Sequence, residues 1–330
     1  MYENINRKKA VLVLLVVMVA SAVLAGILFV AQYGSAGFSI FNSDASSKNN
    51  IDEEKTFASD GIRTLTVKST SENINIISDD SSEIRAHLYG SYASSDKTLK
   101  PKLVVEKDGD NLVVSIDNKS GIMLLQFTCD LKLDIYVPKA YDKELDITST
   151  SGEVSSDDAL KLDRVQIKTT SGEIAVKSMD AAKAVLNSTS GEIYAEGIFG
   201  DLDIDSTSGT IVSQNLTAAS GKINSTSGEI KLKGSIDGIV AGSTSGTIII
   251  DTDRLTKDMA VSTTSGEIVV KLPADANFKL AAKSLSGEID CAFPITVTGN
   301  KKPNNLEGSV GTGNCSVSLS STSGSINITK

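Results

Sequence analysis

The chain has 330 residues, a formal net charge of −9 and only 5% aromatic side chains, with no Trp. This acidic balance argues against a nucleic-acid partner, which needs a basic face. The shortage of aromatic rings weakens a carbohydrate-binding interpretation. Three cysteines without a Cys-x-x-Cys pair or a Cys/His cluster argue against a zinc site. Abundant Gly, Ser and Thr with little Pro are typical of short strands joined by tight turns.

An apolar segment stands near the N-terminus. Residues 10–31 carry no charge and directly follow Arg7, Lys8 and Lys9. Their length matches the ~20 residues that span a bilayer as a helix. The flanking positive charges predict that the tail 1–9 is cytoplasmic and that the rest of the chain lies outside the cell membrane. The alternative is a cleaved signal peptide, with the small residues Gly34–Ala36 near the cleavage site.

The next two segments have different compositions. Residues 32–58 are rich in Ser, Asn, Asp and Lys without an apolar period, which predicts a flexible linker. Residues 59–140 alternate apolar and polar side chains, which predicts strands in irregular first coils that cap one end. Within them, Ser69–Ile74 looks like a degenerate copy of a later phrase, and Asp108–Asn111 is typical of a hairpin turn.

Residues 145–330 are organised by the phrase Thr-Ser-Gly, which recurs about every 19 residues. A fixed period of this kind indicates a stacked-repeat architecture. Positions in each copy are numbered here from its glycine. One copy reads Leu-Ser-Gly, and the motif glycines are Gly152, Gly172, Gly191, Gly209, Gly228, Gly246, Gly266, Gly287 and Gly324.

The repeats share a pattern of inward-facing positions. Positions −7 and −5 are mostly apolar, and so are +2 and +4, so each copy predicts a strand, a corner at Ser-Gly and a second strand. Position −3 is always Ser or Thr and should turn its hydroxyl inward, towards neighbouring backbone groups. We expect the glycine to adopt a backbone conformation closed to other residues. The sequence therefore predicts an all-β chain that forms a parallel β-solenoid.

The repeat is interrupted near the C-terminus. Residues 292–312 contain Pro294, Pro303 and several glycines, and we expect them to form a loop that blunts this end of the solenoid. Val317–Leu319 and Ile326–Ile328 are then expected to complete one last coil.

The phrase Thr170–Val176, its copies and the opening Gly61–Val67 resemble a family of bacterial extracytoplasmic β-helix proteins. Its members are named as candidate adhesins, have no established function, and commonly join a membrane anchor to Ser-Gly-x-Ile-x-Val coils. The resemblance covers about residues 59–330. It implies a right-handed parallel β-helix in the cell envelope, engaged in surface interaction or in envelope-stress responses. It supplies no catalytic residue and no known ligand.

Residues with catalytic potential are scarce. His87 is the only histidine and lies in an alternating strand, where an imidazole usually faces solvent. The chain has no nucleophile elbow, no His-Glu-x-x-His and no phosphate-binding loop. We therefore expect a non-enzymatic, membrane-anchored module, without a cofactor, that binds an envelope protein or polymer. The alternatives are a β-helix polysaccharide lyase or hydrolase acting on envelope glycans, and a stress sensor that signals through a partner.

An acidic column is the one candidate binding site. Position +1 is usually Glu, and stacking in register would place Glu153, Glu173 and Glu192 ~5 Å apart. The simpler interpretation is a solvated edge whose modest repulsion salt screens. The sharper hypothesis is weak Ca²⁺ binding, which needs several oxygens around one ion. The alternate aspartates of Asp201–Asp205 could add a second weak site.

Two of the cysteines fall on inward positions of the repeat. Cys291 is at +4, and Cys315 alternates with the apolar Val317 and Leu319. In an oxidising exterior these two thiols could form a disulfide between neighbouring coils.

Overall fold

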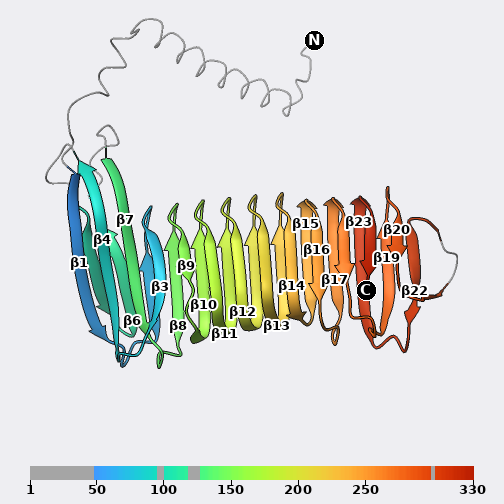
Figure 1. Cartoon of the computed structure of the whole chain (residues 1–330), viewed down its shortest axis with the longest axis horizontal. Coiled ribbons are helices and arrows are strands. Elements are labelled where there is room, and N and C mark those ends of the chain that lie inside the picture. Colours follow the sequence, from blue (N-terminus) through green and yellow to red (C-terminus); the bar gives the residue numbers. More distant parts are fainter. Residues whose placement is uncertain (1–47, 95–99, 118–126, 299–301) are drawn as a thin grey trace, which may run out of the picture. The chain divides into compact units, whose positions relative to one another are not determined.

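The computed structural model describes residues 48–94, 100–117, 127–298 and 302–330. The predicted tail 1–9, the predicted membrane helix 10–31 and residues 32–47 of the predicted linker lie outside these ranges. Residues 49–330 form one compact unit, and every regular element that the structure describes in it is a strand (Figure 1). No helix in the described ranges is long and apolar enough to cross a membrane.

Each regular coil passes once through two facing layers of strands. Strand β11 (Ile174–Ser188) starts after one corner in the second layer, turns at Ser178 and ends in the first layer before the next corner. It pairs in parallel with β12 (Ile193–Ser206), so that Ile174 lies opposite Ile193. The repeat of the sequence is therefore the repeat of the structure, and the predicted solenoid is confirmed.

The first layer contains the strands that precede the corners. Its neighbouring strands pair along the whole stack. In spatial order they are β5 (Lys102–Asp108), β6 (Asn111–Asp117), β2 (Thr64–Lys68), β8 (Glu144–Ser149), β10 (Leu160–Thr169), the later parts of β11, β12 and β13 (Ile211–Ser225), β15 (Ile239–Ser245), β17 (Met259–Ser265), β23 (Cys315–Ser323), β19 (Phe278–Ser284), β22 (Asn305–Val310) and β21 (Thr296–Val297).

The second layer contains the strands that follow the corners. Its order matches that of the first layer, because each coil contributes to both. In spatial order they are β1 (Lys48–Ala58), β4 (Glu83–Ser94), β7 (Phe127–Pro138), β3 (Asn73–Asp79), β9 (Val154–Ser156), the first parts of β11, β12 and β13, β14 (Ile230–Ile236), β16 (Ile248–Thr252), β18 (Ile268–Lys271), β24 (Ile326–Thr329) and β20 (Ile289–Cys291).

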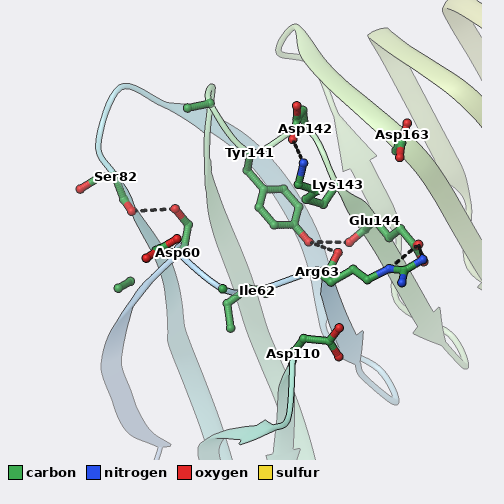
Figure 2. A pocket seen from close by; sticks show the side chains of 14 residues that line it. Asp60, Ile62, Arg63, Ser82, Asp110, Tyr141, Asp142, Lys143, Glu144 and Asp163 are labelled. Atoms are coloured by element: carbon green, nitrogen blue, oxygen red, sulfur yellow. Dashed lines mark hydrogen bonds and ion pairs between the residues drawn. The ribbon is translucent and has the colours of Figure 1, made fainter.

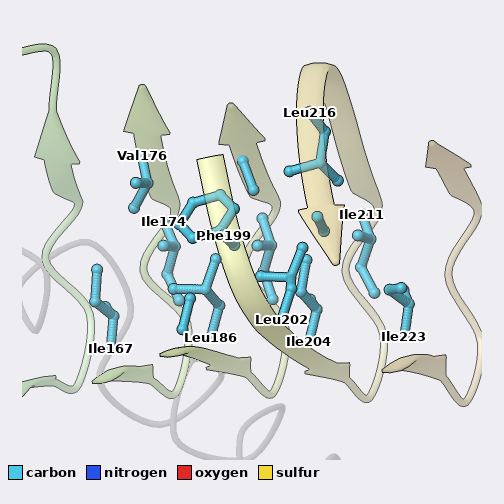
Figure 3. Packing of buried hydrophobic residues seen from close by; sticks show 14 of the residues in the cluster. Ile167, Ile174, Val176, Leu186, Phe199, Leu202, Ile204, Ile211, Leu216 and Ile223 are labelled. Atoms are coloured by element: carbon cyan, nitrogen blue, oxygen red, sulfur yellow. The ribbon is translucent and has the colours of Figure 1, made fainter. Parts of the chain in front are cut away.

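Columns of similar apolar side chains fill the space between the two layers (Figure 3). Because the coils pair in register, the same motif position of neighbouring coils is stacked, and a branched side chain packs against a similar side chain on the next coil. Full burial of one Ile or Leu contributes roughly 1.5–3 kcal/mol. The column at +2 is buried throughout and consists of Ile74, Val154, Ile174, Ile193, Ile211, Ile230, Ile248, Ile268, Ile326 and Ile289.

A column of buried hydroxyls lines the corner, as the sequence predicts for position −3. The Thr169 hydroxyl donates to the Gly172 carbonyl oxygen at 2.8 Å, and the Gly191 N–H donates to the Ser188 hydroxyl oxygen at 2.8 Å. These bonds satisfy backbone groups where the chain turns. The buried members are Ser149, Thr169, Ser188, Ser206, Ser225, Ser243, Thr263, Ser284 and Ser321.

The motif glycines are needed for close approach and not for an unusual backbone conformation. None of them has a positive φ, so that prediction was wrong. A Cβ on Gly209 would instead lie 1.9 Å from the carbonyl oxygen of Gly191, its neighbour in the stack. Positive φ values occur at position +6, where Ser178 (φ 55°) and Asn215 (φ 52°) turn the chain towards the first layer.

The last coil of the sequence is not the last coil of the stack. Strand β23 lies between β17 and β19, and β24 lies between β18 and β20 (Figure 1). The expectation of a terminal coil at 317–328 is therefore wrong in position, although the coil itself is present. The other end has the same design, because β2 lies between β6 and β8.

Antiparallel strands close both ends of the stack. Strand β5 pairs with β6 through the predicted turn at Asp108–Asn111, β4 pairs with β7, and β22 pairs with β19. Strand β1 then pairs with β4. Residues 48–58 are therefore part of the domain, so the predicted linker is wrong over this segment. The Glu53 carboxylate fixes β1 by accepting the Leu103 N–H at 3.0 Å and pairing with Lys100 at 3.0 Å.

Candidate functional site

The predicted acidic column is present at position +1. The Val154 N–H donates to the Glu173 carbonyl oxygen at 2.9 Å, and the Ile174 N–H donates to that of Glu192 at 2.9 Å. Glu153, Glu173 and Glu192 therefore follow one another on adjacent coils. Glu173 and Glu192 are exposed, and Glu153 is half-buried. Farther along the same column, Glu229 pairs with Lys231 at 2.8 Å.

Calcium binding by this column stays a prediction. Within the part of the chain that the structure describes, no three or more His, Cys, Asp or Glu side chains converge closely enough to hold a metal ion. Glu153, Glu173 and Glu192 are stacked in a row, so an ion beside one of them would receive at most one further carboxylate from each adjacent coil. A row of this kind provides fewer oxygens around one point than Ca²⁺ normally takes.

The aspartates of β12 each have a partner on the next coil. Asp201 accepts the Ser220 hydroxyl at 2.6 Å, and Asp205 accepts the Asn224 side-chain amide at 2.9 Å. Asp203 lies 3.7 Å from the Lys222 ammonium. Pairing in register uses these carboxylates to link coils, which leaves fewer of their oxygens for an ion.

The single histidine lies on the strand β4 that pairs with β7. His87 Nε2 is 2.7 Å from a carboxylate oxygen of Asp52 on β1, and its ring stacks on Tyr89 with centroids 4.7 Å apart. The imidazole is half-buried against these two side chains. This arrangement ties β1 to β4 and explains the residue without a catalytic role.

Cys291 and Cys315 are not bridged in the structure. Cys315 starts β23 opposite Phe278, while Cys291 lies in the other layer opposite Ile328. Opposite layers are separated by the packed core, so the predicted disulfide does not form. Burial raises the pKa of the Cys315 thiol, which keeps it protonated.

A charged cleft of about 830 Å³ lies beside the first coil (Figure 2). Tyr141 forms part of its wall, and its buried hydroxyl lies 2.7 Å from the Glu144 carbonyl oxygen and 3.1 Å from that of Arg63. One phenol has one proton, so the two carbonyl groups share it. Burial removes water from the phenolate and raises the pKa of Tyr141 well above its usual range.

The ionic groups around this cleft are paired with one another. Arg63 lies 3.2 Å from the Glu144 carboxylate, and Lys143 lies 2.7 Å from that of Asp142 (Figure 2). Further carboxylates come from Asp60, Asp110 and Asp163. The cleft therefore carries an excess of negative charge, which suits a polar or cationic group. Its residues offer no activated nucleophile beside a base.

A polar groove of about 720 Å³ runs along the central coils. One wall is formed by outward side chains at position −4, including Asn187, Asp205 and Asn224. The other wall is formed by the threonines at −2, including Thr207 and Thr226. The Asn187 amide oxygen is buried and has no hydrogen-bond partner. The groove thus repeats a threonine hydroxyl at each ~4.8 Å step between coils, while the side chain at position −4 varies from coil to coil.

The sequence pattern did not predict the Glu72 cap or the polar groove. The Glu72 carboxylate caps the first corner, where it accepts the Ser69 hydroxyl at 2.7 Å and the Ser71 N–H at 3.1 Å. Glu72 occupies the glycine position of the degenerate copy, and this departure from the repeat was a usable signal. The threonines at −2 also recur in the sequence, but the groove depends on the bend of the chain that begins there, directly after the strand ends at −3.

Comparison with known proteins identifies the domain. The sequence profile of the Toastrack DUF4097 family matches residues 62–329. The chain belongs to this family. The match covers every coil and both end caps apart from β1, and the resemblance to a family of unknown function named for adhesion is confirmed. No curated protein is significantly similar to the chain.

A solved structure shares the fold of this Toastrack domain. A candidate adhesin from Parabacteroides distasonis is 15% identical, covers 85% of this chain and 97% of its own, and has a TM-score of 0.52. A second one, from Bacteroides fragilis, is 16% identical, covers 87% and 100%, and has a TM-score of 0.47. At these identities the likeness shows the fold alone.

Proposed function

We propose that the Toastrack domain is a non-enzymatic module that binds an extended component of the cell envelope, either a polymer or a protein. The polar groove is the observation that carries this proposal. It crosses successive coils and presents a threonine hydroxyl at position −2 of four coils in a row, which suits a ligand that is itself long and repetitive. The structural neighbour from Parabacteroides distasonis is also named for adhesion.

Membrane anchoring through residues 10–31 is part of the same proposal. Support comes from the uncharged segment and the basic residues before it, which predict a single pass with the Toastrack domain outside the cell membrane. Fractionation of cells expressing the full chain or a chain without residues 10–31 tests this point. We expect only the full chain to stay with membranes after a high-salt wash.

Capture of envelope material by residues 49–330 tests the binding proposal. The Asn224→Ala variant removes an amide from the groove wall, whereas Gln214→Ala removes one from the same strand, β13, on the opposite layer. We expect capture of a specific polymer or protein by the unaltered domain and by Gln214→Ala, with strong loss in Asn224→Ala. Equal capture by both variants would exclude the groove.

The alternative is a polysaccharide lyase or hydrolase. Such an enzyme needs clustered acids with cations around the bound sugar, and the charged cleft beside Tyr141 is the place that comes nearest to this requirement. Incubation of the domain with envelope glycans decides the matter. Release of shorter sugars would overturn the binding proposal, and intact glycans after prolonged incubation would support it.

A further inference from the structure

The C-terminal coil fills a slot inside the stack. Strand β23 pairs in parallel with β17 on one side and with β19 on the other, and β24 pairs likewise with β18 and β20. Both walls of the slot therefore come earlier in the sequence than the segment Cys315–Thr329 that fills it.

Both walls of the slot carry the phrase that the inserted coil carries. Thr263 of β17, Ser321 of β23 and Ser284 of β19 are aligned at position −3. A Cβ on Gly287 would lie 2.1 Å from the Gly324 carbonyl oxygen, as at the other corners. The walls of the slot thus contact the repeat positions of the inserted coil, and the same coil from a second chain would make the same contacts.

The inserted coil differs from every other regular coil in its charge. Cys315–Thr329 contains no acidic or basic side chain, and Ser325 replaces the usual Glu at position +1. Ser325 is stacked between Glu267 and Glu288, so a glutamate at position 325 would be repelled by a like charge on each side. A neutral coil enters the slot of another copy without an electrostatic penalty.

The connection to this coil is a short hinge. Residues 311–314 lead from β22, on the outer side of β19, to β23 on its inner side. Gly311 (φ 58°) and Gly313 (φ 66°) make the tight reversal, and the Asn277 side-chain oxygen accepts the Thr312 N–H at 3.2 Å. When extended, four residues reach up to ~14 Å. This length lets the coil reach the slot of a copy lying alongside.

We propose that the coil Cys315–Thr329 exchanges between two copies of this chain, each filling the slot of the other. The contacts in the slot are the same within one chain and between two chains. Protein concentration and the hinge therefore decide which form is populated. The exchange joins two Toastrack domains at their C-terminal ends and goes beyond the binding function proposed above.

Engineered cysteines detect the exchange directly in the full chain. Ala260 of β17 and Ser318 of β23 are exposed register partners, so a Cys pair at these sites reports which β23 fills which slot. In a background with Cys129, Cys291 and Cys315 changed to Ser, chains carrying Ala260→Cys are mixed with chains carrying Ser318→Cys, unfolded together, refolded at high concentration and oxidised. We expect a disulfide that joins one chain of each kind.

Two controls keep the test decisive. The chain with both substitutions, refolded at high dilution, should form the disulfide within itself and so show that the pair has bridging geometry. Deletion of Thr312 should disfavour closure within one chain and increase the mixed disulfide, while an inserted Gly-Ser-Gly-Ser after Thr312 should decrease it. Absence of the mixed disulfide while the double variant bridges internally would overturn the proposal.

Discussion

A Cβ atom on Gly172 would lie 2.0 Å from the carbonyl oxygen of Gly152 on the preceding coil. The same approach recurs at each motif glycine, so the corner column is packed backbone against backbone. No side chain, even the smallest, fits there without moving a coil away from its neighbour.

The first prediction concerns this column. Gly209→Ala places a methyl group against the backbone of Gly191, which has no free direction in which to move, so we expect a loss of about 3 kcal/mol of unfolding free energy. Gly242→Ala is the matched control, because its new Cβ meets side chains and no backbone, with Asn224 at 3.1 Å and Ser262 at 3.8 Å. Urea denaturation followed by circular dichroism measures both. Similar midpoints for the two variants would contradict the close-packing explanation.

The second prediction concerns the buried hydroxyls. Thr169→Val keeps the shape of the side chain but removes the hydrogen bonds to the Gly172 carbonyl oxygen and to the Ser188 hydroxyl. We expect a loss of roughly 1–2 kcal/mol, since buried partners are left unsatisfied. The neighbouring Thr170 at position −2 is exposed, so Thr170→Val should change stability little. If Thr170→Val proves as destabilising as Thr169→Val, the hydroxyl column does not contribute as described.

The third prediction concerns the Tyr141 hydroxyl. Tyr141→Phe removes the proton shared by the carbonyl groups of Arg63 and Glu144, and should cost about 1–2 kcal/mol at neutral pH. Arg63→Ala breaks only an exposed ion pair of the same cleft and should cost at most ~1 kcal/mol. Thermal unfolding at pH 7 compares the two, and a larger effect of Arg63→Ala would refute the assignment.

Alkaline pH provides a fourth prediction. Burial raises the pKa of Tyr141, and the hydrogen bond to the Glu196 carboxylate raises the pKa of Tyr194 to about 12. An unfolded tyrosine has a pKa of ~10, so the folded state holds these protons more tightly. Their contribution to stability is complete below pH ~10 and is lost as the pH rises through the folded pKa. Denaturation midpoints between pH 8 and 12 should therefore fall, less steeply in Tyr141→Phe; equal slopes would contradict this.

Calcium titration provides a fifth prediction. If the stacked glutamates bind Ca²⁺, calorimetry of residues 49–330 should give a saturable signal in the ~0.1–1 mM range of weak extracellular sites. Glu173→Gln removes the middle carboxylate of the three stacked glutamates and should abolish that signal. Glu229→Gln should not, because Glu229 lies between Thr210 and Thr247 in the column and pairs with Lys231. Absence of saturable binding below millimolar Ca²⁺ would end the hypothesis.

The repeating unit of this protein follows from its amino-acid pattern alone. Alternation is a local property of a strand, so Ile174 and Val176 had to face inward together, as did the hydroxyl of Thr169 just before the corner. The period then forced like positions to stack, which placed Glu173 beside Glu192. These conclusions do not depend on the order in which the coils are stacked.

The order of the coils and the shape of the surface depend on contacts between coils that the repeat does not specify. Every coil carries the same phrase, so strand pairing alone would allow β23 between β17 and β19 or at the end of the stack. Chain connectivity and the short hinge at residues 311–314 made the choice. The reason for each motif glycine was also a property of two coils: the carbonyl oxygen of Gly152 excludes a side chain at Gly172, and a single repeat does not contain that contact.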